Sequence, residues 1–187
     1  VDREIIDQNP FLCPDADAAE KMAGHVAAVK AAGDSLGGIV EVRAKGVPAG
    51  LGEPVFDKLD AELAKALMSI GAVKGVEIGA GFEAAKMRGS RHNDPMTPEG
   101  FSSNHAGGIL AGISSGDEIV VRAAVKPIPS IGIEQDTVDI HGRPQKISVT
   151  GRHDISSIPS INVVCQALLW LVLAAHFLRQ NTPLSVT

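Results

Sequence analysis

"GFSSNHAGGILAGISSGDEIVVRAAVKP", residues 100–127, interrupts an apolar segment repeatedly with glycine. The glycines stand at positions 107, 108, 112 and 116. Because glycine weakens a strand, a segment that keeps several of them is expected to bring its backbone close to a flat surface. The apolar residues on both sides of Ser115-Gly116-Asp117 predict a hairpin, with strands over residues 107–114 and 118–126.

Before this stretch, helical and strand patterns alternate. Apolar residues spaced three and four apart predict helices over residues 15–32 and 57–70, and Asp15 or Asp17 is expected to cap the first. Alternation of Val40 and Val42 with Glu41 and Arg43 predicts a strand over residues 38–44, and a second, short strand is expected over residues 73–78. This order of elements is typical of an α+β fold rather than of a doubly wound one.

Two further segments are polar and rich in turn residues. Residues 80–104 lack periodicity, and a loop of that length inside a compact domain is usually functional or mobile. A second strand pair is expected over residues 137–140 and 145–149, around the turn His141-Gly142-Arg143-Pro144. The whole chain, residues 1–187, is interpreted as a single domain.

The segment INVVCQALLWLVLAAHFL, residues 161–178, is apolar almost all round. It is about as long as a membrane span, but it contains Asn162, Gln166 and His176 and has no basic flank on its N-terminal side. We therefore expect a helix buried on most of its faces, in a core or at a subunit interface.

Composition limits the classes of function. The 17 basic and 22 acidic residues give a formal net charge of −5, which argues against a general nucleic-acid surface. Cys13 and Cys165 stand far apart, so neither a disulfide framework nor a structural zinc site is expected, and a reducing, cytoplasmic setting is the simplest interpretation. No signal-peptide pattern opens the chain, and its start at Val1 without Met suggests a fragment.

Three motif interpretations are weak. Gly79, Gly81 and Ala84 match a loose dinucleotide-binding fingerprint after a strand, but Gly89 and Pro95 soon interrupt the helix that this fingerprint requires. The histidines do not have metal-ligand spacing, so no metal is expected. The sequence also has neither a hydrolase nucleophile elbow nor a phosphate-binding P-loop.

Two short segments at strand ends have more specific chemistry. KPIPS, residues 126–130, and TGRHD, residues 150–154, place cations beside a hydroxyl or a carboxylate. Arg152 and Asp154, aimed at one pocket, could hold an anion and move a proton. On spacing alone, a surface ion pair between these two residues is an equally good interpretation.

These segments, read together, resemble the chorismate synthase family. The resemblance is carried by QNPFLCPD (8–15), GDSLGG (33–38), GVPAGLGEPVFDKLDAELAKALMSIGAVKGVEIG (46–79), SNHAGGILAGISSG (103–116), KPIPS and GRHD. It extends from about residue 8 to Arg179 and covers only the C-terminal half of that family's sequence. The half with the Gly-Glu-Ser-His-Gly segment and the two catalytic histidines is not in this chain.

The resemblance implies a carbon-oxygen lyase of the shikimate pathway. Members of the family eliminate phosphate from 5-enolpyruvylshikimate 3-phosphate in an anti-1,4 sense and use reduced FMN, which is not consumed. The family has a β-α-β sandwich fold and forms homotetramers, and some members also have a flavin reductase activity that involves NADP. The flat surface expected beside the glycines is then the isoalloxazine ring.

Site residues follow from the resemblance, position by position. Asp154 matches the acidic residue that acts with the flavin in removing the C6 hydrogen. Flavin contacts are implied for Gly71, Ala72, Ala111, Lys126, Pro127, Ile128, Pro129, Ser130 and Arg152.

Several of these positions differ from the family pattern. Asn is common where Gly71 stands, and glycine is usual at Ala111. Thr and Ser are usual at Ile128 and Pro129, so two possible hydroxyl contacts are lost. After Asp154, Ser160 and Gln166 replace an expected Arg and Glu, which puts substrate binding and turnover in question.

Three hypotheses of function remain open at this point. The first is the FMN-contacting half of a chorismate synthase, inactive by itself. The second is a non-catalytic flavin-binding or oligomerisation module that keeps the glycine-rich strands and the apolar helix. The third, an NAD(P) oxidoreductase, depends only on the fingerprint that begins at Gly79.

Overall fold

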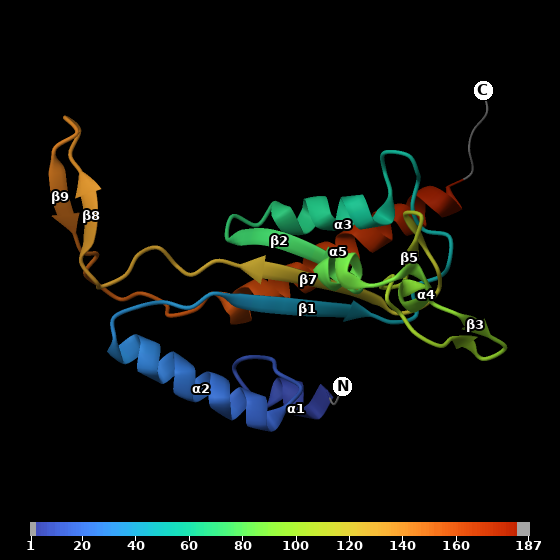
Figure 1. Ribbon diagram of the computed structural model, residues 1–187, viewed down its shortest axis with the longest axis horizontal. Coiled ribbons are helices and arrows are strands. Elements are labelled where there is room, and N and C mark those ends of the chain that lie inside the picture. The colour runs from blue at the N-terminus through green and yellow to red at the C-terminus, as the bar shows by residue number, and fades with distance from the viewer. Residues whose placement is uncertain (1–2, 183–187) are drawn as a thin grey trace. The chain divides into compact units, whose positions relative to one another are not determined.

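The computed structural model describes residues 3–182, and these residues divide into two compact units. Within this range, unit 1 consists of residues 3–38 and 125–161, and unit 2 of residues 39–124 and 162–182. Along the chain (Figure 1), the elements are α1 (Arg3–Asp7), α2 (Ala16–Ala31), β1 (Gly38–Ala44), α3 (Leu59–Met68), β2 (Val73–Ile78), the 3-10 helix η1 (Gly81–Lys86), α4 (Gly89–His92), β3 (Met96–Thr97), β4 (Gly100–Phe101), β5 (Ile109–Leu110), β6 (Ile113–Ser114), β7 (Ile119–Val125), β8 (Gln135–Val138), β9 (Pro144–Ile147) and α5 (Ile158–Asn181).

Unit 2 is built on a three-stranded sheet in the order β1–β7–β2. Figure 1 shows the central strand β7 running opposite to β1. Along β1, Val40, Val42 and Ala44 are buried and the residues between them are exposed, which is the alternation of a strand with one covered face. The predicted α+β class with an antiparallel sheet is confirmed.

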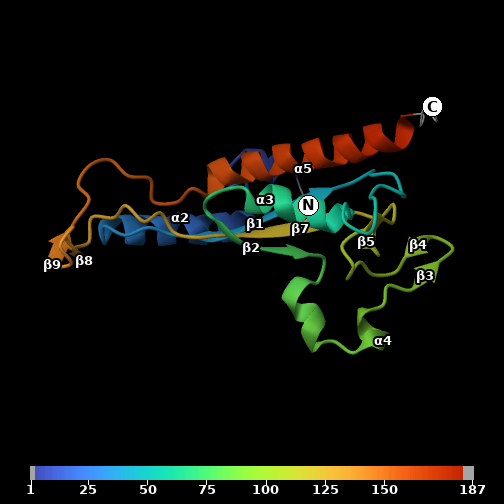
Figure 2. The same ribbon diagram turned by 90° about the horizontal axis from the view of Figure 1, so that it is seen from above.

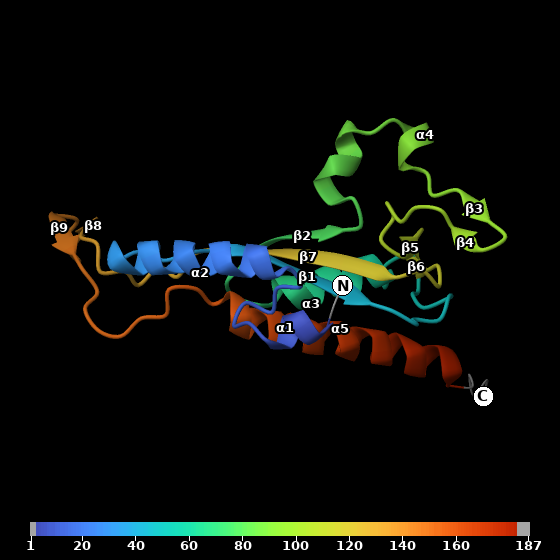
Figure 3. The same ribbon diagram turned by 90° about the horizontal axis from the view of Figure 1, so that it is seen from below.

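Helices cover one face of this sheet. Figures 2 and 3 show α3 and the part of α5 in unit 2 on one side of the three strands, and η1 and α4 on the other. In α3 the predicted stripe is buried, because Leu59, Leu63 and Leu67 are at most 1% exposed. The helix occupies ten of the residues expected over 57–70.

The α5 helix differs from the expectation of burial on most faces. One stripe is buried, formed by Ile161, Cys165, Leu169, Leu173 and His176. The opposite side remains exposed and includes Trp170 and Leu171. By length and composition alone, α5 could cross a membrane, with a mean hydropathy of 2.0 in its most apolar window, but core helices of soluble proteins meet the same criterion.

The predicted hairpin of residues 107–114 with 118–126 is wrong. The first segment instead folds back on itself, and β5 pairs with β6 through Ile109↔Ser114 and Leu110↔Ile113. The second segment becomes β7 at the centre of the sheet, where it pairs with β1 and β2. Burial explains why this segment becomes the central strand. β7 is almost wholly apolar, and a central strand is covered by a neighbouring strand on each edge.

The glycines of this region approach protein backbone. A Cβ atom on Gly107 would lie 2.6 Å from the Cα of Gly79, and one on Gly108 would lie 2.6 Å from the carbonyl oxygen of Glu118. Both glycines also have positive φ, at 66° and 76°. Packing of the chain on itself therefore accounts for these two glycines, without the flat ring that was expected beside them.

Unit 1 contains α2 and the hairpin β8–β9. The carboxylate of Asp15 accepts a hydrogen bond of 2.9 Å from the amide of Ala18, so the predicted cap of α2 is confirmed. The hairpin is also confirmed, but its turn begins earlier than expected. The Asp139 side chain accepts hydrogen bonds from the amides of His141 and Arg143 and so fixes that turn.

The segment 80–104 contains only short elements, consistent with the predicted loop. η1 follows β2 directly and is six residues long. A dinucleotide-binding fingerprint needs a full helix whose N-terminus faces the pyrophosphate. The fingerprint interpretation of Gly79, Gly81 and Ala84 therefore lacks its structural context.

Candidate functional site

The segment Gly33–Gly37 organises the ligand-binding candidates of unit 1. The Ser35 hydroxyl donates a hydrogen bond of 2.6 Å to the carbonyl oxygen of Ile128. On the other side, the Leu36 amide donates one of 2.7 Å to the carbonyl oxygen of Ile155. Residues 126–130 and 152–154 are thus attached to the same short segment, although more than twenty residues separate them along the chain.

Glycine at position 37 permits this arrangement. A Cβ atom there would overlap the carbonyl oxygen of Val125 and would lie 3.1 Å from the ring nitrogen of Pro127. A side chain at this position would therefore push away the strand end that carries Lys126. In the sequence, the GDSLGG segment contributes only to the family resemblance, and this structural role could not be predicted because a single serine hydroxyl has no motif of its own.

Three charged side chains of unit 1 are available to a ligand. Lys126, Arg152 and Asp154 are exposed. Among the residues that the structure describes, none of these three takes part in an ion pair. The alternative of a surface ion pair between Arg152 and Asp154 is therefore not observed. Between them, His153 has a buried Nε2 atom for which no hydrogen-bond partner is found in the described part of the chain.

Three other predicted flavin contacts belong to unit 2. Gly71 and Ala72 form the turn between α3 and β2, where the Val73 amide donates a 2.9 Å hydrogen bond to the carbonyl oxygen of Ile70. A Cβ atom on Gly71 would have no neighbour within 4 Å. The asparagine that the resemblance leads one to expect would therefore fit at this position.

Ala111 lies in the tight turn between β5 and β6. Its φ is 52° and that of Gly112 is 83°, so both central residues of the two-residue turn have positive φ. This is the pattern of a type I′ turn, which glycine and asparagine adopt with the least strain. The methyl group of Ala111 therefore adds backbone strain at a position where the resemblance implies glycine.

A second polar site in unit 2 was not predicted from the sequence. A cavity of about 260 Å³ is lined by Arg43, Gly79, Ala80, Asn104, His105, Glu118, Val120 and Arg122. Its two guanidinium groups already have acidic partners, because both Arg43 and Arg122 contact the Glu41 carboxylate through Nε at 2.7 Å. Burial alone would raise the pKa of Glu41, but its hydrogen bonds to these arginines outweigh that effect and lower it.

Asp94 holds the SNHAGG segment beside this cavity. Its carboxylate accepts hydrogen bonds from the Ser103 hydroxyl at 2.6 Å and from the amides of His105 and Ala106, both at 2.8 Å. Burial opposes ionisation, but these hydrogen bonds prevail and the pKa of Asp94 is lowered. Asp94 thus orders a loop that sequence patterns describe only as polar.

The described residues contain no cluster of three or more histidine, cysteine or acidic side chains with metal-binding geometry. In this region the rings of His92 and His105 lie near each other, with their centroids 6.0 Å apart. Cys13 and Cys165 are both free and buried. Burial raises the pKa of the Cys165 thiol, so it behaves as an apolar core side chain.

Comparison with known proteins places this arrangement in a family. The family model for chorismate synthase matches residues 1–178. Chorismate synthase from Desulfosudis oleivorans is 70% identical over 181 residues, which are 97% of this chain and 51% of that protein. Chorismate synthase from Desulfatibacillum aliphaticivorans is 64% identical over 180 residues, which are 96% of this chain and 50% of that protein.

A solved structure agrees with the sequence comparisons. A crystal structure of chorismate synthase superimposes with a TM-score of 0.77 at 36% identity, covering 95% of this chain and 48% of its own. The chain therefore spans about half the length of the relatives it matches. On its sequence and its fold, the chain belongs to the chorismate synthase family.

Proposed function

We propose that this chain is one half of a chorismate synthase, whose complete form eliminates phosphate from 5-enolpyruvylshikimate 3-phosphate to give chorismate. The observation that carries the proposal is the match of the family model over residues 1–178. We propose that unit 1 and unit 2 both belong to this half of the enzyme, and that the chain by itself is inactive. The complete protein is proposed to be cytoplasmic and homotetrameric, without a nucleic-acid or membrane partner.

Reduced FMN is the proposed cofactor, and the residues of unit 1 fit an anionic ligand of this kind. Lys126 and Arg152 are exposed and form no ion pair with any residue in the described part of the chain, so within it neither must give up an acidic partner to bind phosphate. Ser130 adds a hydroxyl to the same segment. When bound, the reduced flavin supplies electron density that eases departure of phosphate from an allylic carbon.

The chain's own residues have complementary roles in this proposal. Lys126 and Arg152 hold anionic groups and stabilise the negative charge that develops as phosphate departs. Asp154 takes the proton lost from C6 of the substrate, because an exposed, unpaired carboxylate is an available base. Ser35 positions residues 126–130 through the Ile128 carbonyl, so this part of the segment depends on backbone position rather than on the hydroxyl usual at position 128.

Gly71, Ala72 and Ala111 are proposed as flavin contacts from the second unit, through backbone and small side chains. Pro127, Ile128 and Pro129 are proposed as apolar contacts. NADP is proposed only for a flavin reductase activity of the complete protein. At positions 160 and 166, Ser160 and Gln166 offer no charge to the substrate, and any charged contact must come from other residues.

The test is the substitution Asp154→Asn in the complete protein. Loss of the base should lower turnover by at least about 10²-fold, whereas the thermal midpoint should change little because Asp154 is exposed and forms no ion pair within residues 3–182. Asp17→Asn is the matched control, since Asp17 is also an exposed carboxylate of unit 1. Turnover is followed by chorismate formation with reduced FMN supplied.

Two results would contradict the proposal. If Asp154→Asn keeps nearly normal turnover but melts early, Asp154 is a structural residue. If the unaltered complete protein binds reduced FMN but forms no chorismate, the alternative of a non-catalytic flavin-binding or oligomerisation module is correct.

A further inference from the structure

The polar cavity of unit 2 lies on the face of the β1–β7–β2 sheet opposite α3 and α5. Glu41 and Arg43 are exposed and alternate along β1 with the buried residues Val40 and Val42, so their side chains lie on that face. Arg122 of β7 joins them there, because its Nε atom contacts the Glu41 carboxylate. Figures 2 and 3 show η1 and α4 on this side of the sheet.

Both arginines of the cavity keep donors that no described residue uses. A guanidinium group has five N–H donors. Arg122 donates from Nε to Glu41 and from Nη1 to the carbonyl oxygen of Gly79, both at 2.7 Å. Arg43 donates from Nε to Glu41 at 2.7 Å and from Nη1 to Glu118 at 3.4 Å. Within residues 3–182 the Nη2 donors of both side chains are unused, so they are available to an anionic ligand.

Glu41 holds these two arginines in place. Its Oε1 atom accepts from Arg43 and its Oε2 atom accepts from Arg122, so one carboxylate bridges two neighbouring strands. A side chain that is already held in one position loses less conformational entropy when a ligand binds. The pair of guanidinium groups is therefore preorganised for an anion.

A second part of the cavity can accept a hydrogen bond from a ligand. Glu118 Oε1 is buried and has no hydrogen-bond partner in the described part of the chain, and Lys45 Nζ lies 3.8 Å from it. A buried oxygen without a donor costs free energy. The terminal torsion of glutamate is soft, so this carboxylate can turn toward a hydroxyl in the cavity. His105 lines the same cavity, and a neutral imidazole both donates and accepts.

We propose that this cavity binds a small hydroxycarboxylate, a ligand with one carboxylate and at least one hydroxyl group. The carboxylate pairs with the free donors of Arg43 and Arg122, and the hydroxyl donates to Glu118. The charged lining residues and the groups paired with them are three cations, Arg43, Lys45 and Arg122, and two carboxylates, Glu41 and Glu118, with a net charge of +1. This charge complements a monoanion better than a phosphate dianion.

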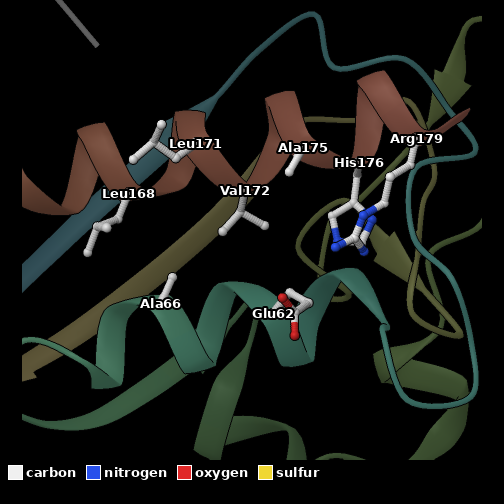
Figure 4. Close-up of a pocket in the computed structure, with 8 residues that line it drawn as sticks. All are labelled: Glu62, Ala66, Leu168, Leu171, Val172, Ala175, His176 and Arg179. Carbon is white, nitrogen blue, oxygen red and sulfur yellow. The ribbon is translucent and has the colours of Figure 1, made fainter. Parts of the chain in front are cut away.

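Other ligands and another hollow fit these observations less well. A dinucleotide pyrophosphate carries two negative charges and needs the N-terminus of a full helix, which the six residues of η1 do not form. The hollow between α3 and α5, of about 180 Å³, has different chemistry. Figure 4 shows that Leu168, Leu171 and Val172 line it, and an anion would lose its hydration beside such apolar side chains.

The experiment titrates the complete protein with D-glycerate, which has one carboxylate and two hydroxyl groups. Oxidised FMN and 5-enolpyruvylshikimate 3-phosphate are present at saturation, so the proposed catalytic site is occupied and no turnover occurs. Isothermal titration measures the dissociation constant. Propionate, which lacks the hydroxyls, should bind at least about 5-fold more weakly, because a hydrogen bond to a charged group is lost. Inorganic phosphate should also bind more weakly than D-glycerate.

Two substitutions locate the site. Arg43→Gln should weaken D-glycerate binding by at least about 10-fold, because it removes a charged donor. Arg88→Gln is the matched control, since Arg88 is an exposed arginine of unit 2 that does not line the cavity, and it should bind like the unaltered protein. Ala80→Leu fills the cavity and leaves every charge in place, so it should also abolish binding.

Absence of D-glycerate binding by the unaltered protein would overturn the proposal and would leave the Glu41 network with a structural role only. Equal affinities of Arg43→Gln and Arg88→Gln, unchanged binding by Ala80→Leu, or tighter binding of propionate or phosphate would overturn it as well. The proposal does not depend on the proposed function. If FMN and 5-enolpyruvylshikimate 3-phosphate fail to bind, the proposed function fails, whereas the dependence of D-glycerate binding on Arg43 and Ala80 still decides this inference.

Discussion

Gly79→Ala should destabilise the chain by about 3 kcal/mol, even though it adds only one methyl group. Gly79 has a φ of 57°, a conformation that costs an L-residue with a Cβ atom roughly 1–2 kcal/mol. The new Cβ atom would overlap the carbonyl oxygen of His105 and would lie 2.5 Å from the amide nitrogen of Gly107. Both are backbone atoms, so side-chain rotation cannot relieve the overlap, and overpacking of this kind costs about 1–3 kcal/mol more.

The same displacement would weaken two backbone hydrogen bonds. The Gly79 amide donates to the carbonyl oxygen of Val120 at 2.9 Å, and the Ala80 amide donates to that of His105 at 2.7 Å. For a chain of this length, a loss of 3 kcal/mol corresponds to a fall of about 6–12 °C in the thermal midpoint. Differential scanning calorimetry would measure it, with Gly71→Ala as the control because Gly71 has open space around it. A midpoint within about 2 °C of the unaltered chain would refute the reasoning, and loss of NAD(P) binding without loss of stability would revive the dinucleotide interpretation.

Three other substitutions test separate parts of the structure. Ala111→Gly should raise the free energy of unfolding by up to about 1 kcal/mol, because it removes positive-φ strain, and urea denaturation would detect it. Asp94→Asn should destabilise the chain by about 1 kcal/mol at pH 7, since an amide nitrogen cannot accept the hydrogen bonds of the carboxylate. Because the folded pKa of Asp94 is lowered, the difference from the unaltered chain should persist at pH 5 and shrink as pH falls below the ordinary value of 3.8, as melting between pH 7 and pH 3 would show. Leu169→Asp should prevent soluble expression, because Leu169 is 1% exposed, and soluble yield equal to that of Trp170→Asp would contradict its role in the core.

Local periodicity predicts the regular elements of this fold well. The α2 helix occupies Ala16–Ala31 within the expected range 15–32, and its cap at Asp15 follows from side-chain chemistry that acts over three residues. Strands β1 and β2 have the expected bounds, and the burial of β1 alternates as expected for a strand with a single covered face. Such features are set by neighbours close in sequence, which is the information that a pattern contains.

The pairing of strands was less predictable, and the reason lies at one residue. A type I′ turn is usually signalled by Asn-Gly or Gly-Gly, whereas the turn between β5 and β6 is formed by Ala111-Gly112. The more obvious turn signal at Ser115-Gly116-Asp117 therefore led to the wrong pairing. The partner of β7 is chosen by burial in the central sheet position, which is a tertiary effect.

The candidate site shows the same division. Residues 126–130 and 152–154 could be found from their strand-end positions and from the resemblance, because charged residue types carry their own chemistry. The residues that hold these two segments in place could not be found from the sequence. Ser35 acts through one hydroxyl on a carbonyl 93 positions away, and Glu41 reaches Arg122 only because β1 lies next to β7.

In the α5 helix, the apolar pattern predicts more burial than the structure shows. Apolar residues almost all round predict burial on most faces, yet only one stripe is buried here. Leu171 shows the difference most clearly, because it is 66% exposed although the pattern predicts burial. Periodicity counts the apolar residues around a helix, whereas burial depends on which elements of the fold pack against each side, and local sequence does not contain that information.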